Sequence, residues 1–124
     1  MKLIRFKKAQ EKIAMGFLSY IPGEKMVRKL QETIQQYIQD ENWQLFLCKE
    51  VEDYIGLIGV EVNETDRIYT IQHISVNPSF RGEGIGYEMV KELELIYPGY
   101  QCKSNDFTEQ FIEKCQRKEE DADR

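Results

Sequence analysis

The stretch NPSFRGEGIG, residues 77–86, decides the fold of this chain because three alternating glycines connect a predicted strand to a predicted helix. Upstream, the β-branched and aromatic run RIYTIQHISV predicts a strand over 67–76, and Pro78 ends it because proline has no N–H to donate to a sheet. Downstream, apolar residues at helical spacing predict a helix from about 84 to 97; they are Ile85, Met89, Leu93 and Ile96.

Such a junction between a strand and a helix suits a phosphate group. The first turn of a helix has N–H groups without intrahelical partners and carries the positive end of the helix dipole. Glycine lets the backbone approach a ligand closely and take up positive φ values, and Arg81 would add a cationic fork. The spacing Gly82-x-Gly84-x-Gly86 differs from the dinucleotide and P-loop fingerprints. A tight turn without a ligand is the alternative that these residues leave open.

Hydrophobic periodicity predicts the other elements of the chain. Strands are expected at 2–6, 43–50, 54–62 and 100–103, and helices at 8–20, at 27–38 and from Asp106 onward. Asp106 is the predicted N-cap of the last helix, with Glu109 completing a capping box. The order β-α-α-β-β-β-α-β-α predicts a mixed α/β fold in one domain, residues 1–115. Residues 116–124, QRKEEDADR, lack strongly apolar side chains and are expected to form a frayed polar tail.

The strand before the glycines changes phase in its middle. Tyr69 and Ile71 share one parity of the strand, whereas Ile74 and Val76 share the other. One extra residue near positions 72–73, a β-bulge, would put both pairs on the same face. A strand that is buried on both faces explains the same pattern without a bulge.

Composition and charge argue against several classes of protein. The 124 residues are 41% hydrophobic and 31% charged, as in ordinary globular domains. A net charge of −5 argues against a general nucleic-acid partner, and no apolar run is long enough to span a membrane. Three cysteines without metal-ligand spacing predict free thiols in a reducing cytoplasm and no bound metal.

The residues around the glycines resemble a motif of the GNAT family of N-acetyltransferases. Val76-x-Pro78-x-x-Arg81-Gly82-x-Gly84-Ile85-Gly86 is similar to the pyrophosphate-binding motif of that family, which follows a strand ending in V-x-P. The predicted element order also matches. The stretch SNDFTEQFIEKC (104–115) looks like the family's N-x-x-A-x-x-F-Y-x-K stretch, with Asn105, Thr108 and Phe111 in matching places. Within the family, the chain is most similar to RibT-like proteins, which are encoded in riboflavin operons of Firmicutes.

The resemblance implies an N-acetyltransferase that uses acetyl-CoA, and it implies a role for each matching residue. Arg81 and the backbone amides of the glycine turn would bind the pyrophosphate of coenzyme A; these amides belong to Gly82, Glu83, Gly84, Ile85 and Gly86. Backbone groups of Ile74 and Val76 would pair with the pantetheine arm. Asn105 would lie near the pantetheine or its thiol end, and Phe111 would belong to the same site. A backbone amide of the strand at 67–76 would polarise the acetyl carbonyl.

Two departures from the family pattern bear on catalysis. Many members place a tyrosine, which can protonate the leaving thiolate, one residue after the position of Phe111; this chain has Ile112 there. The family usually continues with a C-terminal β6–β7 hairpin, for which this sequence leaves only about nine polar residues. Two functions stay open. One is acetyl transfer to an amine of an unidentified small molecule or protein, linked to riboflavin metabolism; the other is a non-catalytic, regulatory acetyl-CoA or CoA binder.

An amine must be deprotonated by a general base, and two residues are predicted for this role. His73 is the single histidine, and its unperturbed pKa of about 6.5 suits the task; a packed or surface histidine without a catalytic part is the alternative. Glu61 is the second candidate, although a glutamate late in the strand at 54–62 also fits a solvated hairpin end. Cys115, Trp43 and Phe46 are expected to be core residues first.

The absence of the hairpin also predicts an open sheet edge. The strand YQCK (100–103) would expose unpaired N–H and C=O groups, and such an edge is a template for another chain. We therefore expect a two-fold homodimer near this strand and the last helix. A monomer whose edge is shielded by that helix is the alternative.

Overall fold

The computed structural model describes residues 1–24 and 26–122. The strands are β1 (Lys2–Arg5), β2 (Trp43–Glu50), β3 (Asp53–Asn63), β4 (Ile68–Val76) and β5 (Gln101–Ser104). The helices are α1 (Glu11–Leu18), α2 (Val27–Gln39), α3 (Ile85–Ile96) and α4 (Glu109–Ala122), with short 3-10 turns η1 (Lys8–Gln10) and η2 (Pro78–Phe80). The predicted order of strands and α-helices, and with it the mixed α/β fold, is confirmed.

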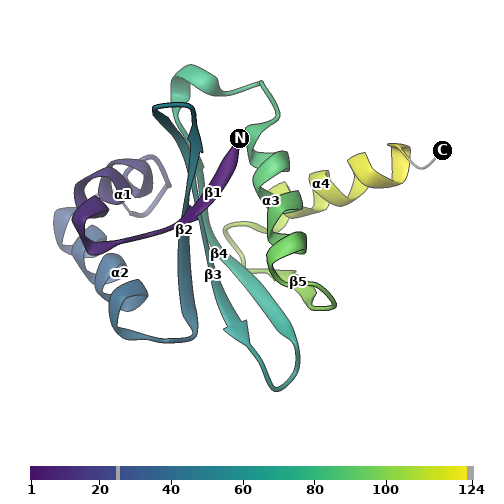
Figure 1. Ribbon diagram of the computed structural model, residues 1–124, viewed down its shortest axis with the longest axis horizontal. Coiled ribbons are helices and arrows are strands. Elements are labelled where there is room, and N and C mark those ends of the chain that lie inside the picture. The colour runs from purple at the N-terminus through teal and green to yellow at the C-terminus, as the bar shows by residue number, and fades with distance from the viewer. Residues whose placement is uncertain (25, 123–124) are drawn as a thin grey trace.

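The five strands form one sheet in the order β1-β2-β3-β4-β5. Neighbouring strands are antiparallel except β4 and β5, which are parallel and are connected through α3. Figure 1 shows α1 and α2 on one face of the sheet and α3 with α4 on the other. Because both faces are covered, the apolar residues of β2 and β3 occupy both parities of their strands.

Each face of the sheet has its own hydrophobic core. On the side of α1 and α2, fully buried residues include Leu18, Ile34, Leu47 and Leu57. On the side of α3 and α4 they include Tyr69, Ile71, Met89 and Leu93. Burial of one such side chain stabilises the fold by about 1.5–3 kcal/mol, so the amphipathic stripes of the helices hold them against the sheet.

Strand β4 carries the predicted bulge. Gly59 of β3 pairs with His73, but the next residue, Val60, pairs with Ile71, so Gln72 is the extra residue. The pairing of β4 with β5 extends only to Ile71. In the described sheet, the two strands therefore separate at the bulge, and the following backbone of β4 has a neighbouring strand on one side.

The start of the last helix differs from the prediction. The capping residue is Asn105 and not Asp106, because Asn105 Oδ1 accepts the N–H groups of Phe107 and Thr108, each at 2.9 Å. The amide group of Asn105 also donates to the backbone oxygen of Gln72 at 3.2 Å. A carboxylate has no hydrogen to donate there.

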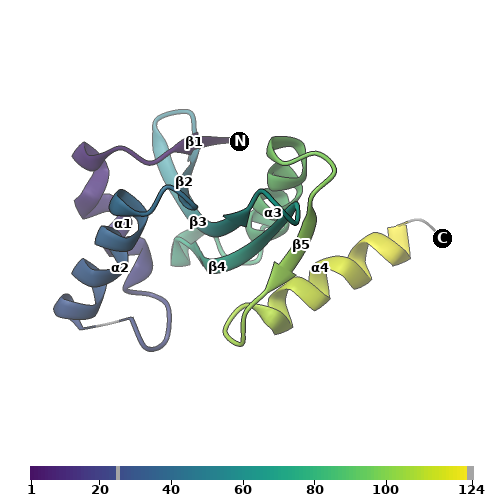
Figure 2. The same ribbon diagram turned by 90° about the horizontal axis from the view of Figure 1, so that it is seen from below.

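Residues 116–122 also differ from the predicted frayed tail, because α4 continues to Ala122. Its charged side chains reach α3: Glu119 accepts a hydrogen bond from Lys91, and the Lys118 ammonium lies 4.3 Å from the ring centroid of Tyr87. The end of the helix projects from the body of the molecule (Figure 2). Residues 123 and 124 lie outside the described part of the chain, and within that part no β-hairpin follows α4.

Candidate active site

Two adjoining cavities lie along the splayed half of β4. The first, the glycine cavity, has a volume of about 510 Å³ and is lined by the glycine turn, by β4 after the bulge and by the start of α4. The second, the loop cavity, has a volume of about 420 Å³ and is lined by the segment between α1 and α2, by α2 and by Trp43. Five residues line both cavities: Ile21, Pro22, Gln72, His73 and Phe107. His73 therefore lies where the two cavities meet.

The glycine turn forms one wall of the glycine cavity. Gly82 and Gly84 have φ values of 85° and 80°, which favour glycine, and a Cβ at either position would meet no protein atom within 4 Å. Gly84 is the N-cap of α3, and its carbonyl accepts the N–H of Glu88 at 3.0 Å. The N–H groups before Glu88 have no intrahelical partner. The open space beside them suits an anionic group such as a phosphate.

Two side chains complete this end of the glycine cavity. Arg81 is exposed, and its Nε donates to the backbone oxygen of Val76 at 3.4 Å while its guanidinium lies 5.9 Å from the ring centroid of Tyr20. Phe111 of α4 packs against Gly86, where a Cβ would lie 2.6 Å from the ring. Gly86 thus permits α4 to approach α3 closely, which brings Phe111 to the cavity.

The backbone of β4 forms the floor of the same cavity. Ile74 and Val76 line it, and both follow the point where β5 leaves β4. On the other side, these residues pair with Ile58 and Gly56 of β3. One edge of this short segment is therefore available to an extended ligand, which could pair with it as an additional strand does.

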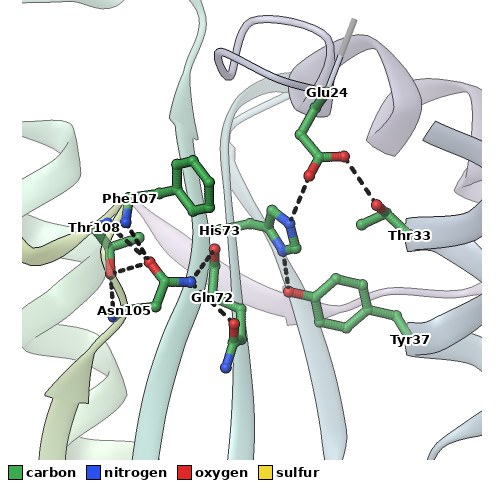
Figure 3. A network of polar contacts seen from close by, with 8 residues as sticks. All are labelled: Glu24, Thr33, Tyr37, Gln72, His73, Asn105, Phe107 and Thr108. Carbon is green, nitrogen blue, oxygen red and sulfur yellow. Dashed lines mark hydrogen bonds and ion pairs between the residues drawn. The ribbon is translucent and has the colours of Figure 1, made fainter. Parts of the chain in front are cut away.

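His73 is the centre of a buried polar network at the junction of the cavities (Figure 3). Its Nδ1 lies 2.6 Å from the hydroxyl of Tyr37, and its Nε2 lies 3.4 Å from Oε1 of Glu24. The second oxygen of Glu24 accepts a hydrogen bond from Thr33 at 2.9 Å. The side chains of His73 and Glu24 are 12% and 11% exposed, so a charge on either is largely shielded from water.

Burial sets the protonation of this network. Burial lowers the pKa of His73 below its usual value of 6.5, and the carboxylate of Glu24 opposes this shift without cancelling it. Burial also raises the pKa of Tyr37 well above its usual value, and Glu24 raises it further. At neutral pH the imidazole is therefore uncharged, and Tyr37 keeps its proton.

Residues 11–115 match the model of the acetyltransferase (GNAT) family. The chain belongs to this family. A protein of Bacillus methanolicus, described as an uncharacterized N-acetyltransferase in the lysA 3' region, is 58% identical over 115 residues, which are 92% of this chain and 94% of that protein. The family model and this relative support N-acetyltransferase activity, and acetyl-CoA is the co-substrate of the family.

Solved acetyltransferase structures share the fold of this GNAT protein. An aminoglycoside 6'-N-acetyltransferase from Acinetobacter haemolyticus superposes with a TM-score of 0.73 at 15% identity, and the match covers 96% of this chain and 88% of that one. Another aminoglycoside 6'-N-acetyltransferase, complexed with coenzyme A, superposes with a TM-score of 0.65 at 16% identity and covers 78% and 55%. At these identities the likeness concerns the fold.

Most of the residues predicted for this GNAT site line the glycine cavity. They are Ile74, Val76, Arg81, Gly82, Gly84, Ile85, Gly86 and Phe111. Glu83 is exposed and does not line it. Asn105 lines the loop cavity instead, where its amide bonds to Gln72. Ile112 is 3% exposed within the core between α3 and α4, so this position lines neither of the two cavities.

The two predicted bases lie in different surroundings. His73 is at the junction of the cavities. Glu61 is exposed on β3, outside both cavities, with Gln72 Nε2 3.4 Å from its Oε1. Of the two predicted bases, His73 lines both cavities and Glu61 lines neither.

Sequence reasoning missed Glu24, Thr33 and Tyr37. Glu24 follows a Pro-Gly turn, and Tyr37 belongs to the apolar stripe of α2, so neither stands out in the sequence. Gly59 is the one sequence feature that could have indicated this network, because a glycine inside a strand often marks the close approach of another group. The group that approaches it is the Tyr37 ring.

Within the described residues, no group of three or more His, Cys, Asp and Glu side chains could hold a metal ion. No helix in this part of the chain is long and apolar enough to cross a membrane.

Proposed function

We propose that this protein binds acetyl-CoA in the glycine cavity, binds an amine in the loop cavity and transfers the acetyl group between them beside His73. The observation that carries the proposal is the junction itself, because the glycine turn and the buried polar network line cavities that share a wall. Arg81 and the amides of residues 82–86 would hold the pyrophosphate. The free edge of β4 at Ile74 and Val76 would pair with the pantetheine arm.

In this reaction the ammonium of the acceptor first loses a proton to a base of the enzyme. The lone pair of the amine attacks the acetyl carbon, a C–N bond forms, and the C–S bond breaks with its electron pair on sulfur. The nitrogen then loses its second proton, and the thiolate gains one. An amine and acetyl-CoA thus become an N-acetyl amine and CoA, with no oxidant or reductant.

A non-catalytic CoA-binding protein is the second candidate function, and the position of Ile112 favours it. The side chain is apolar and buried, so it supplies no proton to a leaving thiolate. The hydroxyl-bearing aromatic residues that line the glycine cavity are Tyr20 and Tyr87, from other elements. Either phenol is an alternative proton donor in the catalytic proposal.

The acceptor that we propose is an amine on a small molecule. The loop cavity, at about 420 Å³, lies in the usual range for small-molecule sites, although a lysine side chain of a protein also fits this chemistry.

A link to riboflavin metabolism rests on the sequence resemblance to RibT-like proteins. A cytoplasmic location is supported by three free thiols, Cys48, Cys102 and Cys115. We also propose that two copies of the chain form a homodimer through β5.

The binding step is tested by thermal unfolding with acetyl-CoA. A ligand at about 100 times its Kd stabilises the folded state by about 2.7 kcal/mol, so the melting temperature should rise. Gly84→Val should abolish the rise because the added side chain fills the space beside the amides. Gly99→Val is the matched control, since Gly99 has nearly the same φ, 82°, in the turn after α3. An unchanged melting temperature of the wild type at millimolar acetyl-CoA would contradict the proposal.

Turnover separates the two candidate functions. Thiol release from acetyl-CoA should be measured over a panel of amines that includes spermidine, an aminoglycoside, free amino acids and lysine peptides. We expect amine-dependent release that falls in His73→Ala, with acetyl-CoA binding retained. Binding without release for every amine would favour the regulatory function.

A further inference from the structure

Both ring nitrogens of His73 have partners in the resting protein. Tyr37 lies on the Nδ1 side at 2.6 Å, and Glu24 lies on the Nε2 side at 3.4 Å. A histidine that accepts a proton directly from a substrate needs a nitrogen lone pair directed at that substrate. Which nitrogen carries the proton therefore decides whether His73 can be that base.

The tautomer follows from the partners of Tyr37. Its side chain is buried, and among the described residues its hydroxyl has one hydrogen-bonding partner, His73 Nδ1. If Tyr37 accepted from Nδ1, its own O–H would remain buried and unpaired, which is unfavourable. Tyr37 therefore donates to Nδ1, and the imidazole proton is on Nε2, directed at the carboxylate of Glu24.

Glu24 is among the residues that line the loop cavity, as His73 is. Oε1 lies 3.4 Å from Nε2 of His73, and Oε2 accepts a hydrogen bond from the hydroxyl of Thr33. Both donors are neutral, so they orient the carboxylate without cancelling its charge. A carboxylate has about four acceptor positions, so two donors leave room for an ammonium. Figure 3 shows the carboxylate between His73 and Thr33.

We propose that Glu24 is the residue that binds the ammonium of the acceptor and takes up its proton, and that His73 and Tyr37 are positioning residues that hold its carboxylate. This inference rests on the proposed acetyl transfer. One N–H bond of the ammonium breaks, the proton joins a carboxylate oxygen, and the electron pair stays on nitrogen for the attack. After the transfer, the carboxyl group returns its proton to solvent.

The charged groups around the network are consistent with this assignment. Among the described residues, the ionisable groups that face His73 are Glu24 from the loop, and Tyr37 and Lys29 from α2. Glu24 raises the pKa of His73, whereas burial and Lys29 lower it. Because the net shift is downward from 6.5, the imidazole stays neutral at pH 7 and keeps its Nε2 proton for Glu24.

The chain has a single histidine, so nitrogen-15 NMR of histidine-labelled protein reports on His73 alone. The resting wild type should show the Nε2–H tautomer and a pKa below 6.5. Glu24→Gln should lower this pKa further, because a raising charge is removed. Lys29→Gln should raise it. Glu50→Gln, at the exposed far end of β2, is the control and should leave it unchanged.

Tyr37→Phe should shift the imidazole toward a mixture of tautomers. With an amine that supports turnover, Glu24→Gln should lower kcat/KM at least about 100-fold, and the melting shift with acetyl-CoA should persist. Thr33→Val, which frees one oxygen of Glu24, should lower kcat/KM less, and it replaces Glu24→Gln if that variant does not fold.

Two results would overturn the inference. A resting Nδ1–H tautomer would leave Nε2 free as the base and make His73 itself the proton acceptor. An unchanged His73 pKa in folded Glu24→Gln would show that the two residues do not interact. If acetyl-CoA did not raise the melting temperature of the wild type, that result would contradict the proposed function, whereas the two results above contradict the role of Glu24.

Discussion

At the scale of single residues, Gly59 explains how the ring of Tyr37 reaches His73. A Cβ at position 59 would overlap the Tyr37 hydroxyl and ring, and Gly59 pairs directly with His73 in the sheet. We predict that Gly59→Ala displaces Tyr37. It should reduce the free energy of unfolding by about 1–3 kcal/mol, the usual cost of overpacking. Urea unfolding measures the loss, and the histidine nitrogen spectrum should show a changed tautomer.

Gly16→Ala is the matched control for that substitution. Gly16 lies in α1, and a Cβ there meets nothing within 4 Å. Alanine in a helix is favoured over glycine by roughly 0.5–1 kcal/mol, so this variant should be slightly more stable. If both variants behaved alike, the close approach of Tyr37 to Gly59 would not matter for stability.

The residues that line the glycine cavity were predictable where a residue type and its neighbours suggest the chemistry. The glycine turn and the single histidine met that condition, and they line the glycine cavity. Glu24 and Tyr37 did not, because only the packing of α2 and its preceding loop on β4 brings them to His73. No local pattern encodes such a contact between distant segments.

At the scale of elements, the bulge in β4 couples the sheet to the site. Gln72 is the extra residue, and both its backbone oxygen and its side-chain oxygen accept from Asn105. We predict that deletion of Gln72 leaves a folded sheet, because Ile71 and His73 then follow one another in register. The deletion should straighten β4 and abolish the melting shift with acetyl-CoA.

Gln72→Ala is the control, because it keeps the bulge and the backbone acceptor and should retain the shift. Circular dichroism checks that the deletion variant is folded. A full acetyl-CoA shift in the folded deletion variant would mean that the separation of β4 from β5 is not required for binding.

The elements themselves were predictable from hydrophobic period, and the bulge from a change of parity. The cap of α4 was not, because Asp106 and Asn105 are both good capping residues. Asn105 is the cap because its side-chain amide can also donate to the backbone oxygen of Gln72, which an aspartate carboxylate cannot do. The length of α4 was underestimated for a similar reason. Its last residues are charged and lack an apolar stripe, but Glu119 and Lys118 contact Lys91 and Tyr87 of α3.

At the scale of the whole molecule, the sheet separates two helical layers, and the site lies where both layers meet the splayed strand. The segment before α2 and the start of α4 come from opposite layers. The first contributes Ile21 and Pro22 to both cavities, and the second contributes Phe107. The glycine motif, the order of elements from hydrophobic period and the stretch at 104–115 together predicted the fold. The shape of the loop cavity was not predictable, because it depends on how the α1–α2 segment packs.

The outer edge of β5 leads to the last prediction. In the described chain β5 pairs only with β4. Gln101 N–H donates to Arg67 at 2.9 Å, and donors alternate along a strand, so the N–H groups of Cys102 and Ser104 point away from β4. An edge of this kind pairs readily with a second copy. Sedimentation at micromolar concentration should therefore give a mass of twice 14.7 kDa.

Ser104→Pro tests the contact, because it removes an outward N–H while the preceding strand residue already has the extended backbone that proline requires. This variant should sediment as a monomer, whereas Ser104→Ala, which keeps the N–H, should remain a dimer. A wild-type mass of 14.7 kDa would contradict the prediction and would mean that the neighbouring helix α4 is enough to protect the edge.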